Sequence, residues 1–246
     1  MKSGFTMSEV LITTGIIGII AAMTFPFLIQ GYRKSVTETE LRKAISMLNQ
    51  AILLSSVKND SPENWAIENG AQDTFKMYIA PYLEVEHECE LQLIDNPKDI
   101  CNNTLYNSKG TKIKNDGNQR NKKYILKNGI AFSFDSGSTI GTTQRRGVFY
   151  IYLETGASRY ILGKNVFTVN LIVNDFKKYI VTGTMDYSPN KTFCSGMKSR
   201  TQMIELCENG SSNTAGGGEG YTKAITCTAM IECNNYKIPK DYPIKF

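Results

Sequence analysis

The stretch that decides the fold is Met1-Lys2-Ser3-Gly4-Phe5-Thr6-Met7-Ser8-Glu9, together with the apolar run behind it that extends to Ile29. As an α-helix, residues 5–29 would reach about 38 Å, enough to cross a hydrocarbon core of about 30 Å with some tilt. Glu9 is the only charged residue in this segment. We therefore predict one membrane-spanning helix over residues 5–29, which tethers the rest of the chain as an extracytoplasmic domain.

The carboxylate of Glu9 would lie within the hydrocarbon of the membrane, so it needs a partner. A carboxylate inside hydrocarbon costs about 2.5–3.5 kcal/mol on lenient scales. If the chain is cut between Gly4 and Phe5, the new amino terminus is a cation one helical turn from Glu9. This terminus can pair with Glu9 of a neighbouring subunit displaced by about one turn, which makes the carboxylate a force for assembly.

A plain signal anchor is the alternative. Lys2 precedes the apolar segment, and Arg33 and Lys34 follow it, so the basic flanks are nearly balanced and the positive-inside rule decides little. A secretory signal would carry a small-residue cleavage site after a shorter apolar core. No such site is evident here, where Phe25-Pro26-Phe27 and Gln30-Gly31-Tyr32 stand.

Residues Gly4-Phe5-Thr6-Met7-Ser8-Glu9-Val10-Leu11-Ile12 resemble the processing signal of type IV pilins and of the related pseudopilins of type II secretion systems. In that family a prepilin peptidase cuts after the glycine and methylates the new terminal residue. The resemblance implies that Gly4 precedes the cut, that Phe5 becomes the methylated terminus and that Glu9 is the assembly carboxylate. Pro26 matches a proline that permits a bend in the family's N-terminal helix. The likeness covers about an eighth of the chain.

The function implied by this resemblance is a filament subunit. Its expected partners are the prepilin peptidase, other pilin-like subunits in a homo- or hetero-filament, and the inner membrane, with the globular domain in the periplasm or, after assembly, at the cell surface. A type II secretion pseudopilin and a minor pilin that binds DNA or surfaces are the alternatives.

The composition fits a tethered, packed domain. The net charge of +5 is mild and the hydrophobic content is 41%, so the chain is no disordered stalk. A nucleic-acid binder usually shows stronger or more clustered charge. We therefore interpret the short basic clusters as solvated loops or strand faces; they are Arg120/Lys122/Lys123, Arg145/Arg146 and Lys177/Lys178.

All six cysteines lie beyond the anchor; they are Cys89, Cys101, Cys194, Cys207, Cys227 and Cys233. Their number is even and their spacings do not match paired Cys-x-x-Cys zinc knuckles, so disulfides in an oxidising compartment are the better interpretation. We predict that Cys89 and Cys101 close a local loop and that the four C-terminal cysteines pair among themselves. Which of those four pair with one another cannot be read from the spacing.

The remaining pattern predicts an α+β domain. Residues 30–58 continue the N-terminal helix with an amphipathic stripe, and residues 59–246 form a globular domain in which this helix packs on an antiparallel sheet. A short helix over residues 74–79 is broken at Pro81. Residues 84–90 and 102–121 are expected to be loops. Strands are predicted over 124–127 and 130–134, joined by a type I′ turn at Asn128-Gly129, and over 147–153, 165–173 and 179–181. Short helices over 201–206 and 224–231 and a docked tail over 236–243 complete the prediction.

The sequence offers no catalytic motif, and we expect neither an enzyme nor a cofactor. We interpret Glu86, His87 and Glu88 as part of an exposed acidic loop, with a metal or pH-sensing role as the minor alternative. The run Gly163-Lys164-Asn165-Val166-Phe167 resembles a segment near which secretion pseudopilins bind calcium. Asn165 stands where aspartate is usual, and no metal ion is assigned.

Overall fold

The computed structural model describes residues 6–65, 71–90, 95–113, 121–135, 147–173, 179–182, 194, 198–210 and 219–246. The chain divides into a first unit of residues 1–36, with Phe246, and a second unit of residues 37–245. Gly4 and Phe5 lie outside the described residues, as do Arg120, Arg145, Arg146, Lys177 and Lys178 of the basic clusters.

The first unit contains the beginning of α1, a helix over Met7–Asn59 that continues through Pro26 and Gly31. In residues 7–36 the large apolar side chains are exposed, and the helix is long and apolar enough to cross a membrane. A helix suits that environment because its backbone hydrogen bonds are internal. The predicted apolar helix is therefore present.

In the second unit, residues 37–59 of α1 are amphipathic, as predicted. One stripe of the helix is buried; it consists of Leu41, Ala44, Ile45, Leu48, Ala51, Ile52 and Ser55. These steps of three and four residues place the side chains on one face. That face joins a core with aromatic residues of the sheet, among them Tyr124, Phe132 and Phe149.

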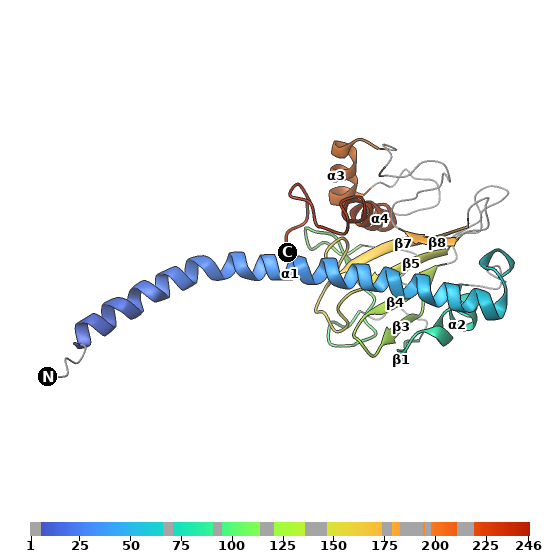
Figure 1. Ribbon diagram of the computed structural model, residues 1–246, viewed down its shortest axis with the longest axis horizontal. Helices are drawn as coiled ribbons and strands as arrows, with labels where there is room; N and C mark the ends of the chain where they lie inside the picture. Colours follow the sequence, from blue (N-terminus) through green and yellow to red (C-terminus); the bar gives the residue numbers. More distant parts are fainter. Residues whose placement is uncertain are drawn as a thin grey trace. The chain divides into compact units, whose positions relative to one another are not determined.

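The main sheet has six strands in the order β1-β3-β4-β5-β7-β8 (Figure 1). Their bounds are β1 Val85–Glu88, β3 Lys123–Leu126, β4 Ala131–Asp135, β5 Gly147–Tyr152, β7 Val166–Val173 and β8 Tyr179–Thr182. All neighbouring pairs are antiparallel. The α+β class, with a long helix on an antiparallel sheet, is confirmed.

Alternation along the strands separates two cores. Phe132, Phe134 and Phe149 face α1, whereas Ala131 and Tyr150 belong to the core on the opposite face. This separation follows from the two-residue period of a strand, which sends neighbouring side chains to opposite faces.

Three local predictions differ from the structure. The acidic segment expected to be a loop forms β1, the edge strand. The polar segment 102–121 contains β2, Leu105–Tyr106, which pairs in parallel with β6, Tyr160–Ile161. The β3–β4 hairpin forms at Asn128-Gly129, but only Gly129 of this pair has positive φ (83°). Because Leu126 N donates to Ile130 O, the loop has three residues rather than the two of a type I′ turn.

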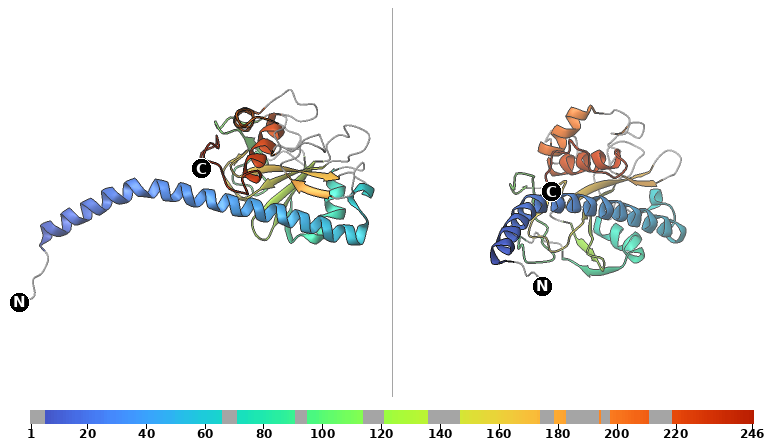
Figure 2. Two further views of the ribbon diagram at one scale, coloured as in Figure 1. Left: turned by 45° about the horizontal axis from the view of Figure 1, so that its top comes forward. Right: turned by 60° about the vertical axis from the view of Figure 1, so that its left-hand side comes forward.

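Short helices flank the sheet. They are η1 Pro62–Asn64, α2 Ala71–Tyr78, η3 Ala80–Tyr82, α3 Arg200–Asn209 and α4 Glu219–Glu232. The predicted helix near residues 74–79 corresponds to α2, and Pro81 lies in η3, where its fixed φ is tolerated. The two predicted C-terminal helices are present as α3 and α4, each longer than expected. Figure 2 shows α3 and α4 on the side of the sheet away from α2.

The disulfides confirm the prediction that Cys89 pairs with Cys101 and that the four C-terminal cysteines pair among themselves. Cys89 pairs with Cys101, whereas the four C-terminal cysteines pair as Cys194–Cys233 and Cys207–Cys227. The last bond joins α3 to α4 and is buried. Cross-links of this kind stabilise a fold by restricting the unfolded chain.

Candidate functional site

Glu9 lies in the first turn of α1, where it binds Thr6. One oxygen of Glu9, Oε2, accepts hydrogen bonds from Thr6 N and Thr6 Oγ1, both at 2.8 Å. Glu9 N donates in return to Thr6 Oγ1 at 3.3 Å. This Thr-x-x-Glu arrangement is a capping box, which satisfies donors that a helix start leaves without partners. The carboxylate therefore has a local partner at the helix start.

Polar side chains further along the apolar segment are also satisfied within the helix. The hydroxyls of Thr13, Thr14 and Thr24 donate to carbonyl oxygens three and four residues earlier. A lipid environment requires such internal partners. Pro26 cannot donate to the carbonyl of Ala22, which makes this turn the weakest of the segment although the helix continues through it.

The side chains around His87 have other partners than a metal ion. His87, Cys89 and Cys101 place possible ligand atoms within 4.8 Å of one another. However, the two sulfurs form a disulfide, and oxidised sulfur is not the thiolate that metals bind. Glu88 instead accepts from Lys122 at 2.5 Å and lies 3.4 Å from Lys76. The hydrogen bond from Lys122 holds the pKa of Glu88 below its usual value.

Asn165 has a structural role. Its side chain accepts from Ile161 N at 2.7 Å and donates to Arg159 O at 3.0 Å. An aspartate could not make the second bond, because an ionised carboxylate only accepts. The amide at this position therefore closes the loop before β7.

Lys123 was predicted to lie in a solvated loop or on a solvated strand face, and this prediction is wrong. Its side chain is 1% exposed, and its ammonium donates to Ile100 O and Asn102 O at 2.9 Å and to Tyr160 Oη at 3.0 Å. Its Nζ also lies 4.3 Å from the ring centre of Tyr160 and 4.8 Å from that of Tyr152. Burial lowers the pKa of Lys123 to about 7, against an opposing effect of a nearby carboxylate. The burial of Lys123 could have been predicted from strand alternation, which places its side chain on the same face of β3 as that of the buried Ile125.

The position of Lys123 explains its burial. The carbonyls that it binds flank Cys101, and the backbone carbonyl of Lys123 accepts from Cys89 N at 2.9 Å. The residue therefore fastens both ends of the Cys89–Cys101 loop to β3. We assign it a structural role, because buried charges persist where their hydrogen bonds are satisfied.

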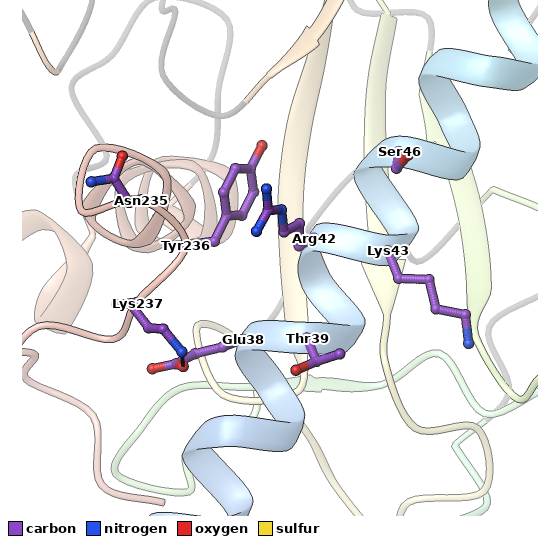
Figure 3. Close-up of a pocket in the computed structure, with 8 residues that line it drawn as sticks. All are labelled: Glu38, Thr39, Arg42, Lys43, Ser46, Asn235, Tyr236 and Lys237. Carbon is purple, nitrogen blue, oxygen red and sulfur yellow. Dashed lines mark hydrogen bonds and ion pairs between the residues drawn. The ribbon is translucent and has the colours of Figure 1, made fainter.

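A groove of about 350 Å³ lies between α1 and the turn that follows α4 (Figure 3). Its lining consists of Glu38, Thr39, Arg42, Lys43, Ser46, Asn235, Tyr236 and Lys237. The Arg42 guanidinium lies over the ring of Tyr236, 5.6 Å from its centre. Glu38 accepts from Lys237 Nζ and from Ile238 N, both at 2.8 Å. These contacts confirm that the C-terminal tail is docked, and sequence spacing offered no signal for them.

A second hollow of about 270 Å³ also borders α1. It is lined by Met47, Gln50, Leu54, Tyr82, Leu83, Glu84, Leu126 and Asn128. Glu84 is the one charged residue in this lining. The two hollows therefore differ in charge, because three of the eight residues in the first lining are cationic.

Comparison with known proteins identifies a family. No curated protein matches the chain, and no solved structure matches it. The model of a family of unknown function, DUF6613, matches residues 27–246, which include the whole second unit and leave out most of the apolar segment. The chain therefore belongs to the DUF6613 family.

Proposed function

We propose that this chain is a type IV pilin-like filament subunit, cut after Gly4 by a prepilin peptidase and assembled through its N-terminal helix. In this role residues 5–29 hold the subunit in the inner membrane before assembly, with the domain in the periplasm. Apolar helices of neighbouring subunits then pack together in the fibre. The methylated terminus of Phe5 pairs with Glu9 of a neighbour.

The observation that carries the proposal is the position of Glu9. It is the single charge of the apolar segment of residues 5–29, and it stands at the spacing from Gly4-Phe5 that the processing signal requires. Its present partner, Thr6, is only one turn away. A terminus created at Phe5 would therefore arise close to this carboxylate.

The domain supports the same proposal. The amphipathic continuation of α1 packs on an antiparallel sheet, the arrangement expected for a pilin-like subunit. Exposed apolar residues 7–29 need a lipid or protein environment, which a membrane provides before assembly and a helical bundle provides afterwards.

The alternatives stay within the same filament class. A secretion pseudopilin would be favoured by neighbouring genes that encode an outer-membrane secretin. A DNA-binding minor pilin receives little support from the cluster at residues 120–123, because Lys122 is paired with Glu88 and Lys123 is buried.

Mass spectrometry of the protein from its native membrane tests the proposal. We expect a chain that starts at Phe5, carries one added methyl group and gains the mass of six hydrogens on reduction of its three disulfides. A Gly4→Leu variant is the control and should retain Met1-Lys2-Ser3. A wild-type chain that still starts at Met1 without methylation would be a plain signal anchor and would contradict the filament assignment.

A further inference from the structure

The exposed face of α1 becomes apolar near the end of the helix. Leu53, Leu54 and Val57 are 61%, 54% and 83% exposed. They occupy the last two turns of the helix, on the side away from the stripe that packs on the sheet. Exposed apolar residues grouped in this way mark a contact surface more often than single ones do.

The two hollows lie on opposite flanks of the exposed face of α1. At 100° per residue, Arg42 and Met47 point about 140° apart around the helix, and each lines a different hollow. Figure 1 shows the same division, with α4 on one side of α1 and β1 and β3 on the other. The helix therefore presents Arg42 on one flank and faces Glu84 on the other.

The charges on these flanks are complementary. Among the described residues, Glu38 is bound to Lys237 and Lys43 lies 3.5 Å from Glu40, which leaves Arg42 as the unbalanced charge of the groove. Its guanidinium lies over the ring of Tyr236, 5.6 Å from the ring centre, and such a planar fork binds carboxylates well. On the other flank, Glu84 is exposed and lines the second hollow, and Glu86, two residues further along the chain, is exposed as well.

We propose that a second copy of this chain docks side by side along α1, so that Arg42 of one copy meets Glu84 and Glu86 of the next. The exposed apolar residues of the two helices, Leu53, Leu54 and Val57, pack in the seam between the copies. The two contact surfaces are different, so the interface is heterologous. Such contacts continue from copy to copy when the rotation does not close.

The contact fits the filament role and rests on that proposed function. Glu84 lines its hollow beside Met47, Gln50 and Leu54, which follow Arg42 by 5, 8 and 12 residues along α1. At about 1.5 Å per residue, parallel neighbours would therefore be displaced by about 8–18 Å along the helix. The terminus–Glu9 pairing requires a displacement of about one turn, about 5.4 Å, which is shorter than this range and leaves the difference to the long side chains of Arg42 and Glu84.

The edge strand is compatible with this contact. β1 ends the sheet on that side and carries the exposed Glu86 and His87. Charged side chains on an edge strand disfavour direct strand pairing between copies. The neighbouring copy is therefore held by side chains, with charge setting the choice of partner and apolar area adding affinity.

A charge swap tests the contact in cells that assemble the full chain. Arg42→Glu and Glu84→Arg should each lower the yield of sheared filaments by about fivefold to tenfold, and the double variant should recover most of the yield, as coupled residues do. Lys109→Glu and Glu154→Arg make the same charge changes at exposed positions that line neither hollow, and they should leave the yield unchanged. Non-reduced mass and thermal unfolding in detergent verify that each variant is folded.

The outcomes separate this contact from the filament role itself. Single variants that assemble like the wild type, or a double variant that stays as defective as the single ones, would overturn the contact and leave the filament role standing. A wild-type chain that is neither cut after Gly4 nor assembled would remove the filament role. Leu53→Ser gives a second measurement: the exposed site tolerates the change, so a folded variant with reduced assembly supports the seam, and full assembly argues against it.

Discussion

The ammonium group of Lys237 lies 2.8 Å from the carboxylate of Glu38, although 199 residues separate them in the chain. The other oxygen of the same carboxylate accepts from Ile238 N at 2.8 Å. Glu38 therefore fastens the C-terminal tail to α1 through a charge and through a backbone hydrogen bond. The two contacts contribute unequally to stability. The Lys237 side chain is 70% exposed, which weakens the ion pair, whereas the Glu38 side chain is only 12% exposed.

Replacement of Glu38 should separate these contributions. Glu38→Ala leaves the Ile238 N–H without its acceptor, and we expect a loss of about 1–2 kcal/mol in the free energy of unfolding. Glu38→Gln keeps an acceptor and loses only an exposed ion pair, so it should cost less than about 1 kcal/mol. Denaturant unfolding of the full chain in detergent gives both values, and hydrogen exchange should show faster exchange in residues 235–246 of the alanine variant. Equal losses in the two variants would mean that the ion pair dominates.

The buried Lys123 predicts a pH dependence of stability. Burial lowers its pKa from 10.5 to about 7 in the folded chain, so between these values the unfolded chain binds the proton more tightly. Stability should then rise with pH, by about 2 kcal/mol between pH 7 and pH 9, because the cost of burying the charge is relieved as the proton is lost. Lys123→Met should lack this rise when unfolding is measured at several pH values. The exposed Lys127→Met is the control and should keep the rise; equal slopes in the two variants would contradict the assignment.

Gly163 should tolerate no side chain. Its φ is 79°, and an added Cβ would lie 2.5 Å from Ile244 Cδ1 and 2.6 Å from Cys227 Sγ. We expect Gly163→Ala to lower the free energy of unfolding by about 2–4 kcal/mol, since backbone strain and overpacking act together. Gly156 has φ of 80° with open space around its Cβ position, so Gly156→Ala measures the backbone cost alone, about 1 kcal/mol. Similar melting temperatures for the two variants would show that the C-terminal tail yields to the added methyl group.

Glu9→Ala should uncouple processing from assembly. The apolar segment becomes more hydrophobic, so membrane insertion and the cut after Gly4 should persist, whereas filament incorporation should fall because the neighbour's terminus loses its partner. Membrane fractionation, N-terminal mass and filament yield measure the three steps. Thr24→Val, elsewhere in the apolar segment, should leave all three unchanged. Normal filaments from Glu9→Ala would remove the assembly role of this carboxylate.

Much of the fold follows from local sequence pattern. The three- and four-residue steps from Leu41 to Ser55 predicted the buried stripe of α1. Apolar runs, with the Asn-Gly turn between the first two, predicted β3, β4, β5, β7 and β8. These elements are long or strongly periodic, so their own residues determine them. The local Cys89–Cys101 bond was also predictable, because the remaining cysteines lie far away in the chain.

The failures have a common physical origin in tertiary contacts. β1 carries glutamates that a strand disfavours, yet pairing with β3 and the ion pair from Glu88 to Lys122 hold it in the sheet. β2 is only two residues long and exists because β6 lies beside it. Lys123 is buried because distant carbonyls satisfy its ammonium, and the groove around Arg42 joins segments almost two hundred residues apart. The pattern of a single sequence does not show which distant residues come into contact in this way.

The order of strands in the main sheet also bears on how the chain reaches its native state. Every pair joins strands that follow one another in the chain once β2 and β6 are set aside. β1 and β3 are separated by 34 residues, but each of the other pairs is joined by a connection of at most 13 residues. These hairpins can therefore close at a low entropic cost while later residues are still being delivered. The contacts of Glu38 with Lys237 and Ile238 can form only after the last ten residues of the chain have been synthesised. We expect the sheet to form early and the tail to lock the helix onto it last, so a chain truncated before Lys237 should retain its hairpins and lose the final closure.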